Sequence, residues 1–484
     1  MTTMKFDQVS TRRGAKVLLN TIFSLTGSRG WRFLFTISLL LTFCWHGFSQ
    51  TVSVYQTTKD GSHKLTQVND RVFREASCGG DVINISDATT YQTMDGFGAA
   101  MTGSAAYLIN NEMSEVQRSD LMNDLFGSPG IGLSFVRHSI GASDFSLSDY
   151  TYHDPGTTFS IDVDKADVIP MLQLAKSINS SLKIMGTPWT APAWMKTNNS
   201  MKGGSLTDNH LDDFALYLVR YIEAFEDEGL PIYAITMQNE PLNETSAYPS
   251  MRMEWFQQSN LLRYHLGPLM ANNGLTTKVL LYDHNWDETD YARDILSISE
   301  TAQYAAGTAF HGYAGSVDAQ STVYNHDTDK GIWFTEQSGG GWSPDFDENL
   351  DWYAQNLIMG AIKNWSKSII LWNLALDTDD GPQNGGCSNC RGVVTINDDG
   401  SYTKEIEYYI LGHLSKFVNP DAQRIYASDT DKIQSIAFKN TDDSMVLVVY
   451  NASTSNSYVR VNTDDQEFDY TIPSGALITF TWNP

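Results

Sequence analysis

The chain has 484 residues, of which 41% are hydrophobic and 18% charged, a composition that indicates a folded globular protein and excludes a disordered chain. This length allows two or three domains. The formal net charge of -25 repels phosphate backbones and anionic lipid surfaces, so we expect neither nucleic-acid binding nor stable membrane association of the mature protein.

The N-terminal region has the pattern of an export signal. An apolar segment, Phe33–Cys44, follows a stretch whose basic residues are Arg12, Arg13, Lys16 and Arg29. The segment is too short to span a bilayer comfortably, but it has the length of the hydrophobic part of a signal peptide. We therefore predict a signal region over residues 1–50, cleavage near Ser49–Gln50, and export to the periplasm, the cell surface or the medium. An uncleaved anchor, or lipidation at Cys44, is the alternative.

Short segments of alternating hydrophobicity occupy both flanks of the remaining chain. Residues 51–93 contain TVSVYQT, HKLTQV and VINIS, and residues 419–484 contain QSIAFKN, MVLVVYN and YVRVNT, separated by Asp, Asn, Ser and Gly. An apolar residue at every second position is typical of strands with one buried face, and frequent turn residues are typical of antiparallel sheets. Because neither flank alone has many such strands, we predict one antiparallel β-sandwich domain formed by both chain ends.

Between these flanks, residues 94–418 alternate between short apolar runs and longer amphipathic segments such as Leu211–Gly229 and Asp347–Trp365, which have the apolar spacing of helices. The eight runs are Thr90–Ala100, Leu133–Gly141, Ser181–Trp189, Tyr233–Glu240, Lys278–Trp286, Ala306–Tyr313, Gly331–Ser338 and Ser366–Leu376. Eight strands that are each followed by a helix are typical of an α/β fold, the (β/α)₈ TIM barrel. We therefore predict a catalytic barrel over residues 94–418.

Two glutamates end two of the predicted barrel strands. Glu240, in TMQNEP, ends the fourth strand, and Glu336, in FTEQSGG, ends the seventh. The carboxyl ends of barrel strands meet at one rim, which is where this fold places its chemistry. Two carboxylates that lie about 5–5.5 Å apart hydrolyse a glycosidic bond with retention, one protonated at rest and the other ionised. Asn239 would offer its amide to a sugar hydroxyl; the alternative is that either glutamate only forms an ion pair at the rim.

The cysteines indicate a local disulfide rather than a metal site. Cys387 and Cys390 are separated by two residues, and no second CxxC or nearby HxxxH supplies the other two ligands that zinc requires. A disulfide that stiffens a loop in an oxidising compartment is the better interpretation. We predict no metal and no organic cofactor.

Ordered motifs from about residue 52 to the C-terminus resemble glycoside hydrolase family 30, which includes lysosomal glucosylceramidase and microbial β-1,6-glucanases. Besides the two glutamate motifs, the resemblance rests on DGFGAAMTGSAA, FVRHSIGASDF, TPWTAPAWMKTN, FHGY, LWNLALD and YYILGHLSKFVNP. It implies a (β/α)₈ barrel with a β-sandwich built from both chain ends, in agreement with the direct interpretation of the flanks and the barrel runs.

The resemblance also implies roles for individual residues. Glu240 matches the acid/base and Glu336 the nucleophile of this family. The remaining matches surround the sugar: Asp144 and Trp189 hold the non-reducing glucose, Trp372 forms an aromatic floor, His311 and Tyr313 lie at the rim near the nucleophile, and Arg137 orients the nucleophile side. For Arg137 and His311, a purely structural role in the core or in an ion pair is an equal alternative.

The expected reaction is a double displacement in which Glu336 attacks the anomeric carbon and Glu240 protonates the leaving oxygen. The net charge of -25 and the lack of a long apolar run in the active-site loops favour a β-1,6-linked glucan, or glucan side branches, over a membrane lipid. The alternatives are a glucosylceramidase, a family-30 glycosidase for xylan or a fucoside, and a non-catalytic carbohydrate-binding protein, which the presence of both glutamates disfavours. If the loop Gly381–Gly392 closes the sugar site, exo action is favoured.

Overall fold

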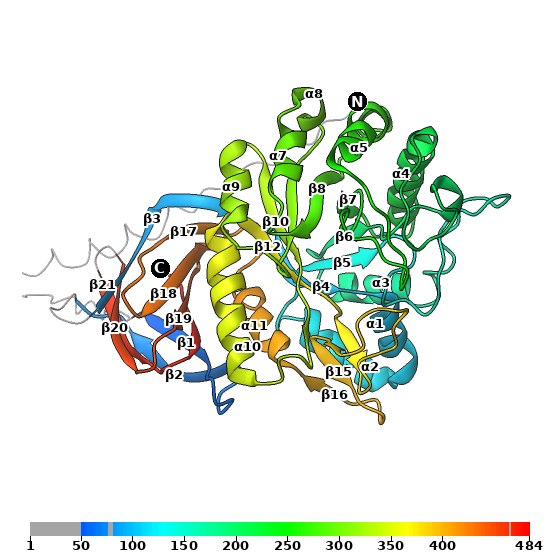
Figure 1. Cartoon of the computed structure of the whole chain (residues 1–484). Coiled ribbons are helices and arrows are strands. Elements are labelled where there is room, and N and C mark those ends of the chain that lie inside the picture. Colours follow the sequence, from blue (N-terminus) through cyan, green and yellow to red (C-terminus); the bar gives the residue numbers. More distant parts are fainter. Residues whose placement is uncertain (1–49, 76–80, 464–465) are drawn as a thin grey trace, which may run out of the picture. The chain divides into compact units, whose positions relative to one another are not determined.

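The computed structural model describes residues 50–75, 81–463 and 466–484 (Figure 1). The predicted signal segment and Cys44 therefore lie outside the described residues. Within the described ranges, no helix is both long enough and apolar enough to cross a bilayer.

Eight parallel strands close into a barrel, which confirms the predicted fold. They are β4 (Gly96–Ala100), β5 (Phe135–Ser139), β6 (Lys183–Thr187), β7 (Ile232–Thr236), β8 (Lys278–Asn285), β9 (Gly307–His311), β10 (Gly331–Glu336) and β12 (Ser366–Leu371). Each strand lies on one of the predicted runs, and β12 pairs with β4 to complete the ring. The strand that precedes Glu240 is the fourth of the ring, and the strand that Glu336 ends is the seventh.

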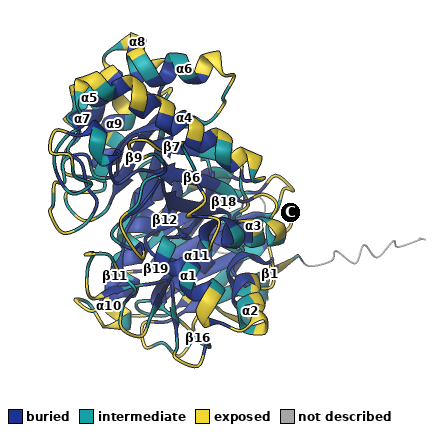
Figure 2. Cartoon of the chain, turned by 90° about the vertical axis from the view of Figure 1, so that its right-hand side faces the viewer, coloured by how far each residue is buried: buried dark blue, intermediate teal, exposed yellow. Residues whose placement is uncertain are grey.

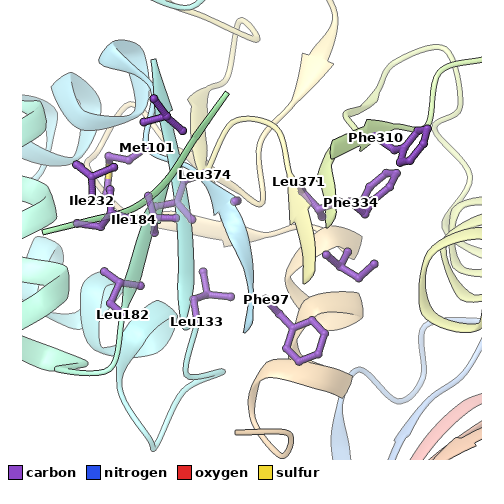
Figure 3. Close-up of a cluster of buried hydrophobic side chains, with 14 of the residues drawn as sticks. Phe97, Met101, Leu133, Leu182, Ile184, Ile232, Phe310, Phe334, Leu371 and Leu374 are labelled. Atoms are coloured by element: carbon purple, nitrogen blue, oxygen red, sulfur yellow. The ribbon is translucent and has the colours of Figure 1, made fainter. Parts of the chain in front are cut away.

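The barrel has one core inside and another outside. Seven of its strands each contribute one buried side chain to a small cluster: Phe135, Met185, Ala234, Leu280, Ala309, Trp333 and Ile370. Neighbouring residues such as Ile184 and Phe334 belong instead to a large cluster between the strands and the helices (Figure 3). Alternate residues of a strand point to opposite faces, so both faces are buried and the strands read as continuous apolar runs.

Helices lie outside the barrel, and several of them have one buried and one exposed face (Figure 2). Helix α4 (Leu211–Asp227) buries Phe214, Leu218, Tyr221 and Phe225 on one face, as its spacing predicts, and Gly229 follows it with a φ of 78°. The other α-helices are α1 (Gly103–Tyr107), α2 (Glu115–Phe126), α3 (Val168–Ile178), α5 (Trp255–Asn260), α6 (Gly267–Asn272), α7 (Asp290–Leu296), α8 (Ser299–Ala302), α9 (Ala319–His326), α10 (Phe346–Tyr353) and α11 (Ile406–Ser415). The predicted helix over 347–365 is α10 followed by a π-helical segment, Ala354–Ala361.

Both chain ends form the second domain, as predicted. Its nine strands are β1 (Thr51–Thr57), β2 (Thr66–Val72), β3 (Asp81–Thr93), β17 (Gln423–Ala427), β18 (Ile433–Lys439), β19 (Met445–Asn451), β20 (Ser457–Thr463), β21 (Gln466–Ile472) and β22 (Leu477–Trp482). They follow the order β2-β1-β22-β19-β18-β17-β3-β20-β21, and the outermost strands β2 and β21 contact each other. One pair, β3 with β20, is parallel, which differs from the purely antiparallel expectation.

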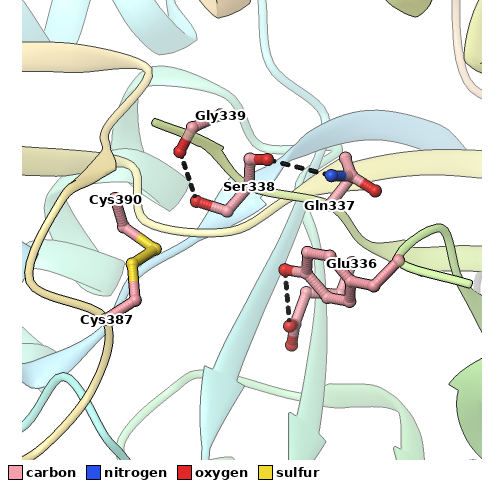
Figure 4. The surroundings of a disulfide bond; sticks show 7 residues. Glu336, Gln337, Ser338, Gly339, Cys387 and Cys390 are labelled. Carbon is pink, nitrogen blue, oxygen red and sulfur yellow. Dashed lines mark hydrogen bonds between the residues drawn. A yellow bond between two sulfur atoms is a disulfide. The ribbon is translucent and has the colours of Figure 1, made fainter. Parts of the chain in front are cut away.

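Short strands after the barrel strands β10 and β12 position the loop that contains the two cysteines. β11 (Gly339–Gly340) pairs with β14 (Cys390–Arg391), and β13 (Ala375–Asp377) pairs with β15 (Val394–Ile396), which pairs with β16 (Tyr402–Lys404). The pairing of β11 with β14 brings the cysteine loop next to the segment that follows Glu336 (Figure 4).

Candidate active site

The two predicted catalytic glutamates lie close together at the rim of the barrel. Glu336 is the last residue of β10, and Glu240 follows β7 by four positions. One carboxylate oxygen of each, together with one ring nitrogen of His311, lies within 4.8 Å of the others. This proximity agrees with the short carboxylate separation of retaining glycosidases, about 5–5.5 Å, and not with the roughly 6.5–9.5 Å of inverting ones.

The backbone at Glu240 is strained and anchored. Its φ is 44°, in the left-handed region that costs a non-glycine residue about 1 kcal/mol or more. Its N–H donates to the carbonyl of Asp283 at 2.9 Å, and the side-chain amide of Asn243 donates to Oε2 at 2.8 Å. These bonds hold the carboxylate in one orientation toward the neighbouring Glu336.

Arg137 and Tyr313 position the other carboxylate. The Arg137 guanidinium donates from Nη1 to Oε2 of Glu336 and from Nη2 to Oδ1 of Asn239 at 2.7 Å. The Tyr313 hydroxyl donates to Oε1 of Glu336 at 2.9 Å. Both oxygens of Glu336 are therefore directed by hydrogen bonds, and a permanent positive charge lies beside the group that the resemblance implies to be the nucleophile.

Asp283 anchors Arg137 and His311 by hydrogen bonds, although it is not among the predicted site residues. Its carboxylate accepts hydrogen bonds from Arg137 (3.0 Å), Thr236 (2.8 Å), His311 (3.0 Å) and Thr335 (2.7 Å). Burial alone would raise the pKa of Asp283, but the charges of Arg137 and His311 and these hydrogen bonds hold that pKa far below its ordinary value. Asp283 is thus a buried anion shared by two cations.

A bulge in β8 turns Asp283 inward. The register with β9 shifts between Tyr282 and His284, and both Tyr282 and Asp283 have a positive φ, 70° and 66°. Such a bulge re-aims the side chains at the end of a strand. The only sequence signal for Asp283 was its position as a polar residue at a strand end. That position does not distinguish a buried residue with several hydrogen-bond partners from a residue exposed at the rim.

His311 lies among three carboxylates, those of Glu240, Asp283 and Glu336. Its ring nitrogens contact Glu240 at 3.2 Å and Asp283 at 3.0 Å, and Glu336 lies 3.9 Å away. Burial lowers the pKa of His311, but the surrounding carboxylates outweigh it and raise that pKa to about 9. For Glu240 burial acts in the opposite direction and would raise the pKa. The hydrogen bond and charge of His311 outweigh burial and lower the pKa of Glu240 to about 2. The surroundings thus favour a proton on His311 over one on Glu240.

Glu240, His311 and Glu336 form the one group among the described residues with ligand atoms close enough for a metal ion. Both ring nitrogens of His311 already contact carboxylates, and Glu336 is bound by Arg137 and Tyr313. A cation at this point would have to displace one of these partners and would lie next to the Arg137 guanidinium. Hydrogen bonding among the charged groups themselves accounts for the cluster.

A cavity of about 420 Å³ opens in front of the two glutamates. Seven of the nine predicted site residues line it: Asp144, Trp189, Asn239, Glu240, Tyr313, Glu336 and Trp372. Arg137 and His311 are fully buried and lie outside this lining, so in this arrangement they contact the carboxylates and not the cavity. Their position agrees with the buried ion-pair alternative that the sequence left open.

The sugar-facing part of the cavity combines aromatic rings with one unpaired carboxylate. The rings of Trp189 and Trp372 stack with centroids 5.0 Å apart, and the Arg137 guanidinium lies against both. Oδ1 of Asp144 is buried and has no hydrogen-bond partner. Burial, and next the charge of Glu336, raise the pKa of Asp144 well above its ordinary value. A sugar hydroxyl would supply the partner that this oxygen lacks.

Tyr248, Ser338 and Trp342 also line the cavity and were not among the predicted site residues. Gly385, Gly386, Cys387 and Cys390 line it as well, and they belong to the loop Gly381–Gly392 that the sequence analysis considered as a wall of the sugar site. The disulfide between Cys387 and Cys390 confirms the local bond that the spacing indicated (Figure 4). The loop lies against Asp144, because Asn384 donates its N–H to the carbonyl of Asp144 at 2.7 Å. Gly385 has a φ of 76°, and a Cβ there would lie 2.3 Å from the carbonyl of Ala247, so glycine is required for this close approach.

The fold and the site together define a retaining glycoside hydrolase: a (β/α)₈ barrel with two carboxylates within 4.8 Å at its catalytic rim. The chain belongs to glycoside hydrolase family 30. The family's TIM-barrel domain matches residues 94–418, and its β-sandwich domain matches residues 421–480.

Similar proteins include glucanases and a glucosylceramidase. The endo-1,6-β-D-glucanase BGN16.3 of Trichoderma harzianum is 33% identical over 88% of this chain and 92% of its own length. The lysosomal acid glucosylceramidase of Mus musculus is 28% identical over 89% of each chain. The solved structure of the endo-β1,6-glucanase BT3312 has 35% identity and a TM-score of 0.85, with 90% of this chain and 99% of that chain covered.

The raised pKa of His311 predicts a pH-dependent contribution to stability. Because its folded pKa of about 9 exceeds the ordinary 6.5, the proton on His311 stabilises the fold fully below about pH 6.5, and this stabilisation is lost as the pH rises toward 9. We expect the difference in free energy of unfolding between the wild type and His311→Gln to shrink over that window, measured by urea denaturation. His138→Gln is the matched control: burial lowers the pKa of His138 to about 3, so its difference stays constant above pH 6.5. If the difference in free energy of unfolding between the wild type and His311→Gln stayed constant from pH 6.5 to 9, the raised pKa of His311 would be contradicted.

Proposed function

We propose that this glycoside hydrolase cleaves β-1,6-glucosidic bonds in glucans. The observation that carries the proposal is a retaining carboxylate pair in a cavity lined by Asp144, Trp189 and Trp372, in a chain whose similarity to β-1,6-glucanases exceeds its similarity to a glucosylceramidase. The net charge of -25 supports a soluble polysaccharide over a membrane lipid.

In the proposed reaction, Glu336 attacks the anomeric carbon, and the bond to the leaving oxygen breaks as Glu240 protonates that oxygen. His311 supplies this proton across the 3.2 Å contact to Oε1 of Glu240. In the second step Glu240 takes a proton from water, whose oxygen bonds to the anomeric carbon as the ester to Glu336 breaks, and the proton returns to His311. The β configuration is retained.

We propose that the residues around the cavity bind the glucosyl unit in distinct ways. Asp144 and Asn239 accept or donate hydrogen bonds to its hydroxyls, and the rings of Trp189 and Trp372 contact its C–H faces. Arg137, and in part Tyr313, act by positioning Glu336.

The cysteine loop and the barrel rim influence whether the enzyme cleaves a glucan at its end or within the chain. The disulfide-closed segment Gly385–Cys390 bounds the cavity beside Asp144, which by itself favours exo action. At the same mouth, Tyr313 and Trp342 are 42% and 54% exposed, so aromatic surface continues beyond the cavity. We propose that further glucose units follow this surface and that the enzyme acts within chains, as the names of its glucanase relatives state of those proteins.

We further propose that the protein is exported. The support is the signal pattern over residues 1–50 and the disulfide, a bond typical of oxidising compartments. Stable membrane association after removal of the signal is not expected, because the net charge is strongly negative.

A panel of substrates tests the proposed specificity. We expect rapid hydrolysis of a linear β-1,6-glucan and of gentio-oligosaccharides, with kcat/KM at least about tenfold lower for laminarin, xylan and glucosylceramide in mixed micelles. Chromatography of early products distinguishes oligosaccharides, expected from endo action, from glucose alone. Glu336→Gln is the inactive control. Turnover of glucosylceramide or xylan without turnover of the β-1,6-glucan would overturn the assignment, and inverted anomers in an NMR time course would overturn the mechanism.

A further inference from the structure

A second cavity, of about 510 Å³, adjoins Glu240 on the side of the β8 end. Besides Glu240 and Leu242, its lining consists of residues with polar groups, namely Asn243, Tyr282, His284, Asn285, Asp287 and Glu288. Glu240 is the one residue that lines both this cavity and the sugar cavity. The acid/base therefore stands between two spaces, one in front of the nucleophile and one away from it.

The position of Glu240 determines what the second space can hold. The acid/base must reach the oxygen that joins the two parts of the substrate, so the glycosyl unit lies on the side of Glu336 and the leaving group lies on the other side of Glu240. The second cavity is on that other side, since neither Glu336 nor Asp144 lines it.

The walls of this cavity are fixed in advance of binding. The Tyr282 hydroxyl donates to the carbonyl of Asn285 at 2.8 Å, and Oδ1 of Asn285 accepts the N–H of Tyr313 at 3.2 Å. Nδ1 of His284 is buried without a hydrogen-bond partner, and Nε2 lies 4.0 Å from Oε1 of Glu240. A rigid wall with an unpaired ring nitrogen is suited to a partner rich in hydroxyl groups.

The side chains with a permanent charge that line the second cavity are all acidic. Asp287 and Glu288 contribute two carboxylates, and no Lys or Arg is among the lining residues. Asp287 is exposed and Glu288 is partly buried, with Oε1 accepting the N–H of Asp290 at 3.1 Å. Carboxylates accept hydrogen bonds from sugar hydroxyls but repel a carboxylate on the ligand.

We propose that this cavity is the leaving-group subsite, and that Asp287 and Glu288 select neutral glycosyl units against uronic acids. The inference rests on the retaining reaction proposed above. In the reverse sense the same subsite binds an acceptor: Glu240 removes the proton of an acceptor hydroxyl, the acceptor oxygen bonds to the anomeric carbon, and the ester to Glu336 breaks, which regenerates its carboxylate.

Reactivation of a trapped intermediate measures this subsite directly. The 2-deoxy-2-fluoro-β-glucosyl fluoride is expected to form a slow-turnover ester on Glu336, detected by mass spectrometry. Return of activity is then followed in buffer alone, with methyl β-glucoside, and with methyl β-glucuronide. For the wild type we expect the glucoside to accelerate reactivation in a saturable manner and the glucuronide to be about tenfold less effective. This difference in reactivation rate between the two acceptors should become smaller at high salt, which screens the repulsion between carboxylates.

Variants of the two acids distinguish the proposed subsite from a general charge effect. In the double variant Asp287→Asn/Glu288→Gln, the two acceptors are expected to accelerate reactivation to within about twofold of each other, each rate taken relative to that variant's own reactivation in buffer. Asp287→Lys is expected to favour the glucuronide. The matched control is Glu226→Gln/Asp227→Asn at the exposed end of α4, which makes the same change in net charge and should leave the difference between the two acceptors intact.

Three results would overturn the inference. They are acceptor reactivation that does not saturate, a glucuronide as effective as the glucoside in the wild type, and an unchanged difference between the two acceptors in the Asp287→Asn/Glu288→Gln variant. Failure of the wild type to form the ester at all would count against the retaining reaction itself, so the two failures are distinguishable.

Discussion

Replacement of Glu336 by Ala is expected to lower kcat on β-glucosides by about 10⁴-fold or more, because it removes the carboxylate that forms the covalent intermediate in the proposed reaction. With an activated aryl β-glucoside, added azide should restore turnover and yield the α-glucosyl azide, since the small anion enters the space vacated by the carboxylate. Glu240→Ala should instead retain formation of the intermediate from the activated substrate and yield the β-glucosyl azide. NMR of the azide products assigns the two roles.

The opposite stereochemical outcome would exchange the roles of the two glutamates. The stated assignment is supported by the contacts of the two glutamates: both oxygens of Glu336 accept hydrogen bonds from Arg137 and Tyr313, whereas Glu240 contacts His311, whose pKa is raised. If both variants gave the same azide anomer, the residue whose variant gave the unexpected anomer would not have the role proposed for it.

Asp283→Asn is expected to lower both stability and activity. The change leaves the buried Arg137 and His311 without their shared anion, so we expect a loss of about 3 kcal/mol in the free energy of unfolding and of about 10²-fold in kcat. Because the pKa of Asp283 is held low in the folded state, the wild-type contribution is present above its ordinary pKa and is lost as the pH falls below it. Urea denaturation and steady-state kinetics at neutral pH measure both effects.

Asp95→Asn is the matched control for this prediction. Asp95 is also a buried carboxylate of the barrel, but it accepts hydrogen bonds from Trp333 and Tyr233, each at 2.7 Å, and does not line the cavity. We expect Asp95→Asn to be destabilised while its folded fraction keeps a wild-type kcat. An equal loss of kcat in both variants would show that Asp283 acts only through stability.

Local sequence patterns were sufficient for the barrel and for the catalytic pair. Each barrel strand is buried on both faces, so each appears as a short apolar run, and the polar residue that ends the run marks the rim. The same logic located Glu240 and Glu336, and the motifs around them indicated the family. The disulfide between Cys387 and Cys390 was also accessible, because its two partners are neighbours in the chain.

The sequence by itself thus determined the fold class, the two carboxylates that meet at the rim and seven of the fourteen residues that line the sugar cavity. Only the tertiary structure decided that Arg137 and His311 lie behind that cavity, that Asp283 joins them, and that the β8 end forms a second cavity beside Glu240. The physical reason is that strand periodicity reports which face a residue occupies, whereas a bulge, a left-handed φ or an ion pair between distant strands depends on packing that no local pattern records.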